Sequence, residues 1–190
     1  MRNKVKSKII IYLLINVLVI GGDDYKMPPK AIADIVDASA LPGISISPDK
    51  NQILIMERST LTSIEELSQP ELKLAGLRIN PIANGRSRAS YYTGLTIQNF
   101  KSGKQKKVKG LPPDGRISNV SWSPDGKNIA MAITKGNRIN LYIVNVKNAK
   151  AKLLFKSGLN AIYGTPFYWI SNSKELIAVS YTHLTLPTNR

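Results

Sequence analysis

The stretch ISNVSWSPDGKNIAMAI, residues 117–133, predicts a strand, a tight turn and a second strand. Apolar and polar side chains alternate on both sides of the central Ser123-Pro124-Asp125-Gly126, which is the period of half-buried strands. Pro presets φ for the second position of a type I turn, Asp tolerates the next position, and Gly closes the turn. The stretch therefore predicts a β-hairpin.

This hairpin pattern recurs along the chain. GISISPDKNQILIM (43–56) has Ser47-Pro48-Asp49 in the same frame, and FYWISNSKELIAV (167–179) is a degenerate third copy with Asn172 in place of Asp125. After each of the first two hairpins comes a strand, a lysine-flanked turn and another strand, in LTIQNFKSGKQKKVKGL and LYIVNVKNAKAKLLF. A unit of four strands and about 45 residues is the period of a propeller blade.

We therefore predict an all-β fold at residues 43–179, a partial and open β-propeller of about two to three four-stranded blades. A sandwich built from the same repeats is the alternative. The first unit carries about 30 more residues than the second, which predicts a short helical insertion in the first blade at about residues 57–94. An open propeller leaves an unpaired strand edge, so we expect the chain to associate when expressed alone.

Short helices are predicted before the repeats and inside the insertion. In the segment 25–43, Pro29 starts a helix with Ile32, Ile35 and Val36 on one face, and Leu41-Pro42-Gly43 ends it. In the insertion, Ser63 and Glu66 have the spacing of a capping box. A second helical turn is expected from Pro70 and Glu71 to Gly76, with Leu72, Leu74 and Ala75 packed on the blade.

The first residues have the pattern of an export signal. Four basic residues precede a continuous apolar run from Ile9 to Ile20, which is short for a membrane span. We predict a signal peptide at residues 1–21 and an N-terminal extension at 22–42, with an uncleaved anchor as the alternative. The protein is then exported, periplasmic or secreted, and has no membrane contact after signal cleavage.

The last residues, SYTHLTLPTNR (180–190), resemble translated sequencing adapter. The third repeat stops in mid-blade here, so we expect a non-native tail and a chain that is part of a longer protein. On this interpretation His183, the only histidine, is not native. The alternatives are a native strand at Tyr181–Leu186 and a short protein that ends at Arg190.

The positive charge is concentrated in one part of the chain. Without the two ends, 22 Lys and Arg face 12 Asp and Glu, and residues 101–156 alone hold 13 basic and 2 acidic residues. A polyanion-binding face is one interpretation. Solvated, edge-protecting lysines at the outer-strand turns explain the pattern better, because no aromatic or arginine cluster accompanies them. We expect no nucleic-acid partner.

Three segments together resemble the N-terminal region of glutamyl endopeptidase-like enzymes of the prolyl oligopeptidase family: PPKAIADIVDA, SIEELSQPELKLAGLRINP and GRSRASYYTGL. The resemblance runs from about Tyr25 to about Val179. It implies an N-terminal propeller followed by an α/β-hydrolase domain, in a secreted serine peptidase that cleaves after glutamate. The partners it implies are a peptide substrate in the parent protein and the parent's own C-terminal hydrolase domain, which is missing from this chain.

No catalytic, cofactor-binding or metal site is predicted in the chain itself, and no cofactor. Gly85-Arg86-Ser87-Arg88-Ala89 lacks the final glycine of a nucleophile elbow, and a Ser-His-Asp triad needs a native histidine. The absence of Cys excludes thiolate metal sites and disulfides.

Two clusters of charged residues are candidate binding sites. Glu65-Glu66 resembles the acidic pair of related aminopeptidases, but Glu66 already serves the capping box. Arg78, Arg86 and Arg88 have side chains suited to an acidic substrate, or are simply solvated.

The predicted function is that of a substrate-gating propeller in an exported serine peptidase. The alternative is a non-enzymatic, TolB-like periplasmic propeller that binds proteins or cell-wall components. The sequence beyond residue 179 distinguishes the two, since only the peptidase continues into a hydrolase domain.

Overall fold

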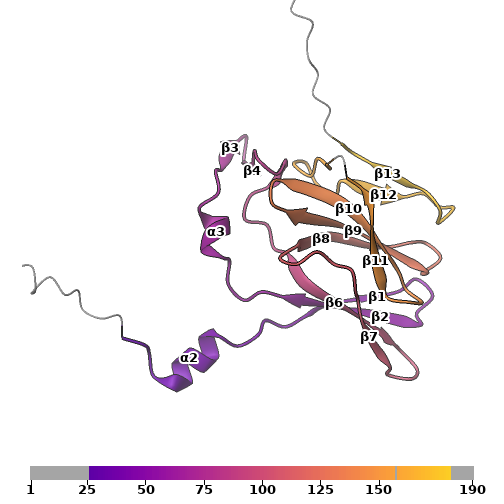
Figure 1. The fold of residues 1–190 in the computed structure, drawn as a ribbon, viewed down its shortest axis with the longest axis horizontal. Coiled ribbons are helices and arrows are strands. Elements are labelled where there is room, and N and C mark those ends of the chain that lie inside the picture. Colours follow the sequence, from indigo (N-terminus) through magenta and orange to yellow (C-terminus); the bar gives the residue numbers. More distant parts are fainter. Residues whose placement is uncertain (1–25, 157, 181–190) are drawn as a thin grey trace, which may run out of the picture. The chain divides into compact units, whose positions relative to one another are not determined.

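The computed structural model describes residues 26–156 and 158–180 (Figure 1). By its contacts the chain divides into one unit that ends at Ala38 and another that starts at Ser39. The described part of the first unit holds α2 (Lys30–Val36), with Pro29 at its N-cap as predicted. The predicted end at Leu41-Pro42-Gly43 is wrong, since the helix stops at Val36. No residue of α2 is buried, so burial does not favour further turns of so short a helix.

The second unit is built from antiparallel strands in two successive meanders and a final hairpin. The first meander is β1 (Gly43–Ile46), β2 (Gln52–Arg58), β6 (Tyr92–Asn99) and β7 (Gln105–Lys107). The second is β8 (Arg116–Trp122), β9 (Asn128–Lys135), β10 (Arg138–Asn145) and β11 (Lys150–Phe155), seen side by side in Figure 1. The hairpin is β12 (Phe167–Trp169) and β13 (Leu176–Ala178).

The two meanders pair with each other only marginally. In the ladder between β6 and β8 the single paired position is Tyr92 with Ile117, and an isolated bridge joins Lys109 to Lys150. Two four-stranded antiparallel units and the start of a third, with no closure among the described residues, confirm the predicted all-β class and are consistent with a partial propeller.

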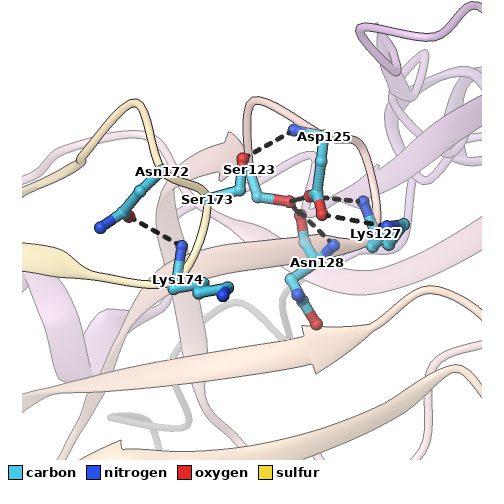
Figure 2. A network of polar contacts seen from close by, with 7 residues as sticks. All are labelled: Ser123, Asp125, Lys127, Asn128, Asn172, Ser173 and Lys174. Atoms are coloured by element: carbon cyan, nitrogen blue, oxygen red, sulfur yellow. Dashed lines mark hydrogen bonds and ion pairs between the residues drawn. The ribbon is translucent and has the colours of Figure 1, made fainter.

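The Ser-Pro-Asp turns are stabilised by one polar network that is repeated. Ser123 Oγ donates to Asp125 Oδ1 at 2.7 Å and accepts from the Asn128 backbone N–H at 3.0 Å (Figure 2). Ser47 makes the equivalent bonds to Asp49 at 2.6 Å and from Gln52 at 2.9 Å. The buried hydroxyl therefore closes each turn from the inside.

The degenerate third turn keeps this shape without the serine. Ile170 occupies the position of Ser123, and its backbone N–H still donates to the Glu175 carbonyl at 3.0 Å. Asn172 replaces Asp125 and accepts from the Lys174 backbone N–H at 3.0 Å (Figure 2). The prediction of a third, degenerate hairpin is therefore confirmed.

Strand β9 is buried on both faces. Ile129, Met131 and Ile133 pack with Leu54 and Leu95 of the first meander. Ala130 and Ala132 point to the other side and pack with Leu159, in the connection after β11, and with Phe167 of the third repeat. The sequence pattern predicted a half-buried strand, but the third repeat covers the alanine face, and the small side chains allow it to approach closely.

The same tryptophan contact joins successive repeats. Trp122 Nε1 donates to Ser45 Oγ at 3.0 Å, from the second repeat to the first. Trp169 Nε1 donates to the Ser121 carbonyl at 3.2 Å, from the third repeat to the second. Ser45 and Ser121 occupy equivalent positions, so each indole donates to the equivalent residue of the preceding repeat, to a side-chain hydroxyl in the first case and to a backbone carbonyl in the second.

The insertion between β2 and β6 holds four short elements: α3 (Ile64–Leu67), β3 (Leu72–Leu74), β4 (Leu77–Asn80) and β5 (Gly85–Arg86). Ser63 caps α3 by accepting from the Glu66 backbone N–H at 3.2 Å, which is one of the two hydrogen bonds of the predicted capping box, while Oε2 of the Glu66 side chain lies 3.4 Å from Arg116.

The second predicted helical turn of the insertion is wrong. Leu72, Leu74 and Ala75 do not form a helix packed on the blade: β3 pairs with β4, and both leucines are exposed. Ala75 and Gly76 have φ of 48° and 80°, which is the two-residue hairpin geometry that matches strand twist.

Candidate functional site

A cleft of about 460 Å³ lies between the insertion and the ends of the strands around it. Four arginines line it: Arg58 at the end of β2, Arg86 on β5, Arg88 just beyond, and Arg116 at the start of β8. These four side chains make the lining strongly basic. A cleft of this size accommodates a small ligand or one to two residues of a peptide.

Two adjacent tyrosines hold two of these guanidinium groups. Arg58 lies over the Tyr92 ring at 5.1 Å and donates from Nη2 to the Tyr92 hydroxyl at 3.2 Å. Arg116 lies over the Tyr91 ring at 5.9 Å. Cross-strand pairing of Arg58 with Tyr92 fixes the first contact, and pairing of Tyr92 with Ile117 brings Arg116 beside it.

Glu66 places one carboxylate in the cleft. The residue is only 8% exposed, and its Oε2 lies 3.4 Å from Arg116 Nη1. This distance makes an ion pair, but Oε2 accepts no hydrogen bond among the described residues. Among the described residues Arg116 is the ion-pair partner of this buried carboxylate, and the unsatisfied Oε2 is a cost to the fold.

A second carboxylate, Glu71, holds two arginines of the insertion. Arg78 donates from Nε and Nη2 to its two oxygens at 3.0 and 2.8 Å, and Arg88 Nε lies 3.8 Å from Oε2. The hydrogen bonds from Arg78, with a further one from Ser87, lower the pKa of Glu71 to about 2. This ion pair fixes the β3–β4 hairpin and leaves Arg88 partly neutralised.

The structure divides the members of each of the two charged clusters between the cleft and other surroundings. Glu65 is exposed and does not line the cleft, whereas Glu66 does. Arg86 and Arg88 line the cleft, but Arg78 lies outside its lining, in the bidentate pair with Glu71.

Sequence reasoning missed Arg58 and Arg116. Their neighbourhood depends on strand pairing across 34 residues, between Arg58 and Tyr92, and across 25 residues, between Tyr92 and Ile117, so no local pattern marks them. The only local signal is the Tyr91-Tyr92 pair, whose rings turned out to hold the two guanidinium groups.

The segment 85–89, which resembles a nucleophile elbow in part, belongs to the small sheet of the insertion. Gly85 and Arg86 pair with β4, and the Ser87 backbone N–H donates to the Arg78 carbonyl at 2.9 Å, so no strand-to-helix turn forms around Ser87. Among residues 26–156 and 158–180, no group of three or more His, Asp or Glu could hold a metal ion. His183 lies outside the described residues.

Comparison with known proteins identifies relatives of the chain. It is 39% identical over 179 residues to the probable glutamyl endopeptidase, chloroplastic, of Oryza sativa subsp. japonica, and 38% identical over 181 residues to the protein of the same name from Arabidopsis thaliana. The chain is a relative of the glutamyl endopeptidases. The predicted family resemblance is thereby confirmed. The alignments cover 87% and 89% of this chain but only 18% of either endopeptidase, so the chain spans about a fifth of their length.

No family model matches the chain. The solved structures that match the chain include the acylaminoacyl peptidase of Pyrococcus horikoshii, with 17% identity, a TM-score of 0.46, and coverage of 82% of this chain and 19% of that one. A putative dipeptidyl aminopeptidase IV from Bacteroides ovatus has 17% identity, a TM-score of 0.38, and coverage of 64% and 18%.

Residues 1–21, predicted as a signal peptide, lie outside the described residues, and so do residues 181–190 of the predicted tail. In the part of the chain that the structure describes, no helix combines the length and apolar character that a membrane crossing requires.

Proposed function

We propose that the chain is the propeller part of an exported serine peptidase, related to the glutamyl endopeptidases, in which the propeller limits access to an α/β-hydrolase domain. The observation that carries this proposal is the 39% identity to a probable glutamyl endopeptidase. Coverage of only 18% of that relative agrees with a parent protein that contains a further domain.

The catalytic groups belong, on this proposal, to the hydrolase domain of the parent. A serine nucleophile needs a histidine base and a carboxylate that orients it, and the described residues contain no histidine. The propeller's part is to admit small or flexible peptides and to exclude folded proteins. The parent's substrate is a peptide with glutamate before the cleaved bond.

The proposed organisation of the chain follows the sequence prediction. Residues 1–21 direct export, 22–42 form an extension, and 43–179 form the propeller with its insertion at about 57–94. Residues 180–190 are a non-native tail.

The test is to recover the gene beyond codon 179 and assay its full product. We expect further blades, a G-x-S-x-G elbow serine with later Asp and His, and cleavage of glutamyl peptides in preference to glutaminyl ones. Replacement of the elbow serine by Ala should abolish cleavage while leaving the protein folded. A reading frame that closes the propeller and stops would refute the peptidase proposal and favour the TolB-like binding module.

A further inference from the structure

The charges in the arginine-lined cleft are unbalanced. Arg116 pairs with Glu66, and Arg88 shares Glu71 with Arg78. Within the described ranges, Arg58 and Arg86 have no carboxylate within ion-pair distance, although both line the cleft. Two guanidinium groups of the cleft lining are therefore available to a ligand.

Guanidinium groups in a cleft favour one kind of ligand. Like charges close together repel, so guanidinium groups that line one cleft favour a ligand with negative charge. The planar guanidinium presents paired N–H donors that match the two oxygens of a carboxylate. Arg58 is moreover oriented by Tyr92, so less freedom is lost when it binds.

A carboxylate already belongs to the lining of the cleft. Glu66 reaches it from α3, is 8% exposed, and has Oε2 3.4 Å from Arg116 and without a hydrogen bond among the described residues. Because Oε2 is itself buried, Glu66 pairs with Arg116 from inside and leaves Arg58 and Arg86 for a ligand. The same lining contains neutral amides and hydroxyls, including Gln69, Ser90 and Asn119, which suit peptide groups.

We infer that the cleft binds the side-chain carboxylate of an acidic peptide, with Arg86 and Arg58 as the residues that contact it. Glutamate suits the site because its carboxylate extends beyond the peptide backbone, which stays at the open mouth of the cleft. This binding deepens the proposed function by placing recognition of acidic substrates in the propeller. It needs no cleavage, however, and is tested without the hydrolase domain.

The experiment measures binding by the full 190-residue chain. An acetylated and amidated hexapeptide with two glutamates, labelled with fluorescein, is titrated at low ionic strength and followed by anisotropy. Its glutamine counterpart is the matched peptide. We expect the glutamate peptide to bind about tenfold more tightly, and Arg86→Gln to remove about tenfold of that affinity. Arg86→Lys should restore part of it, since charge remains but paired donation is lost.

The control variant is Lys101→Gln, which removes the same charge from an exposed turn outside the cleft. It should bind like the unchanged chain. Arg58→Gln is a second, independent variant, and circular dichroism with thermal melts verifies that each variant folds. Equal losses in Arg86→Gln and Lys101→Gln, equal binding of both peptides, or no binding at all would overturn the inference. Displacement by free N-acetylglutamate amide as effectively as by the unlabelled hexapeptide would refute a peptide ligand.

This experiment and the assay of the full parent protein fail separately. Loss of the peptidase proposal leaves a binding cleft to be measured. A parent that cleaves glutamyl peptides while the cleft variants bind normally would place glutamate recognition elsewhere.

Discussion

At the scale of single residues, the serine before each Pro-Asp turn has more partners than its side-chain size suggests. Ser123 is fully buried, and its hydroxyl lies between the Asp125 carboxylate and the Asn128 backbone groups (Figure 2). Its hydrogen bond is the main reason why the pKa of Asp125 is lowered. The same cause lowers the pKa of Asp49 through Ser47.

We expect Ser123→Ala to cost about 1 kcal/mol of stability, because the Asn128 N–H loses its side-chain acceptor. The pKa of Asp125 should rise towards its ordinary value, as measured by NMR titration. A carboxyl with a lowered pKa stabilises the fold above its ordinary value of 3.8, and this contribution is lost as pH falls through the folded pKa. The variant should therefore lose less stability on acidification. Asp49 is the internal control, and an unchanged Asp125 titration would contradict the prediction.

Glu71 gives a second prediction with pH. Because Arg78 and Ser87 lower its pKa from 4.5 to about 2, its contribution is fully present above pH 4.5 and disappears as pH falls towards 2. Amides of the β3–β4 hairpin should then lose protection against solvent exchange, relative to the intrinsic rate at each pH, while amides of β9 should keep theirs. Arg78→Gln should move the Glu71 titration upward. Hairpin amides with the same protection factor at pH 4.5 and at pH 2 would contradict this prediction.

At the scale of elements, the linker between β7 and β8 is held against the start of β11. The Lys109 N–H donates to the Ala149 carbonyl at 2.9 Å, and the Ala151 N–H donates to the Lys109 carbonyl at 2.7 Å. Gly110 follows with a φ of 83°, and a Cβ added there would lie 2.7 Å from the Ala151 carbonyl oxygen. The close approach of two backbones explains why glycine is required.

Gly110→Ala should therefore destabilise the protein more than the same change at Gly103. At Gly103, φ is 67° but a Cβ would meet nothing within 4 Å, so alanine should cost about 1 kcal/mol from backbone conformation alone. At Gly110 the steric conflict should add about 1–2 kcal/mol. Chemical denaturation of both variants measures the difference. Equal losses at the two sites would mean that the backbone contact is absent in solution.

At the scale of the whole repeat unit, stability depends on how each repeat packs on the one before it. Ladder pairing joins the first two meanders at a single position, so side chains carry this interface. The alanine face of β9 is covered in turn by the third repeat. The indole N–H groups of Trp122 and Trp169 each donate a hydrogen bond to the preceding repeat, at equivalent positions, and so help to fix how successive repeats are oriented.

A double-mutant cycle with Trp122→Phe and Ser45→Ala should show coupling of about 0.5–1.5 kcal/mol, the usual contribution of such a hydrogen bond. The readout is the free energy of unfolding of the two single variants and the double variant. Trp169→Phe combined with Ser45→Ala is the control pair, since these residues make no bond to each other, and their effects should add. Additive effects in the first cycle would show that the indole N–H does not link the repeats.

The sequence alone determined the features that depend on local chemistry: the strand–turn–strand pattern around Ser123-Pro124-Asp125, its recurrence at Asp49 and Asn172, and the cap at Ser63. These depend on contacts within a few residues, so their sequence patterns are short and readable. The hairpin at Ala75-Gly76 was missed because helix-breaking glycine and positive-φ hairpin turns look alike without their strand partners.

Only the tertiary structure decided which side chains meet. Arg58 and Arg116 line one cleft because β2, β6 and β8 pair across long sequence separations. Glu66 lines the same cleft, whereas its neighbour Glu65 is exposed outside it. The burial of both faces of β9 depends on packing of successive repeats. Hydrophobic burial and ion pairing are properties of groups brought together by the fold, so neither the cleft nor the interface between repeats has a local sequence pattern.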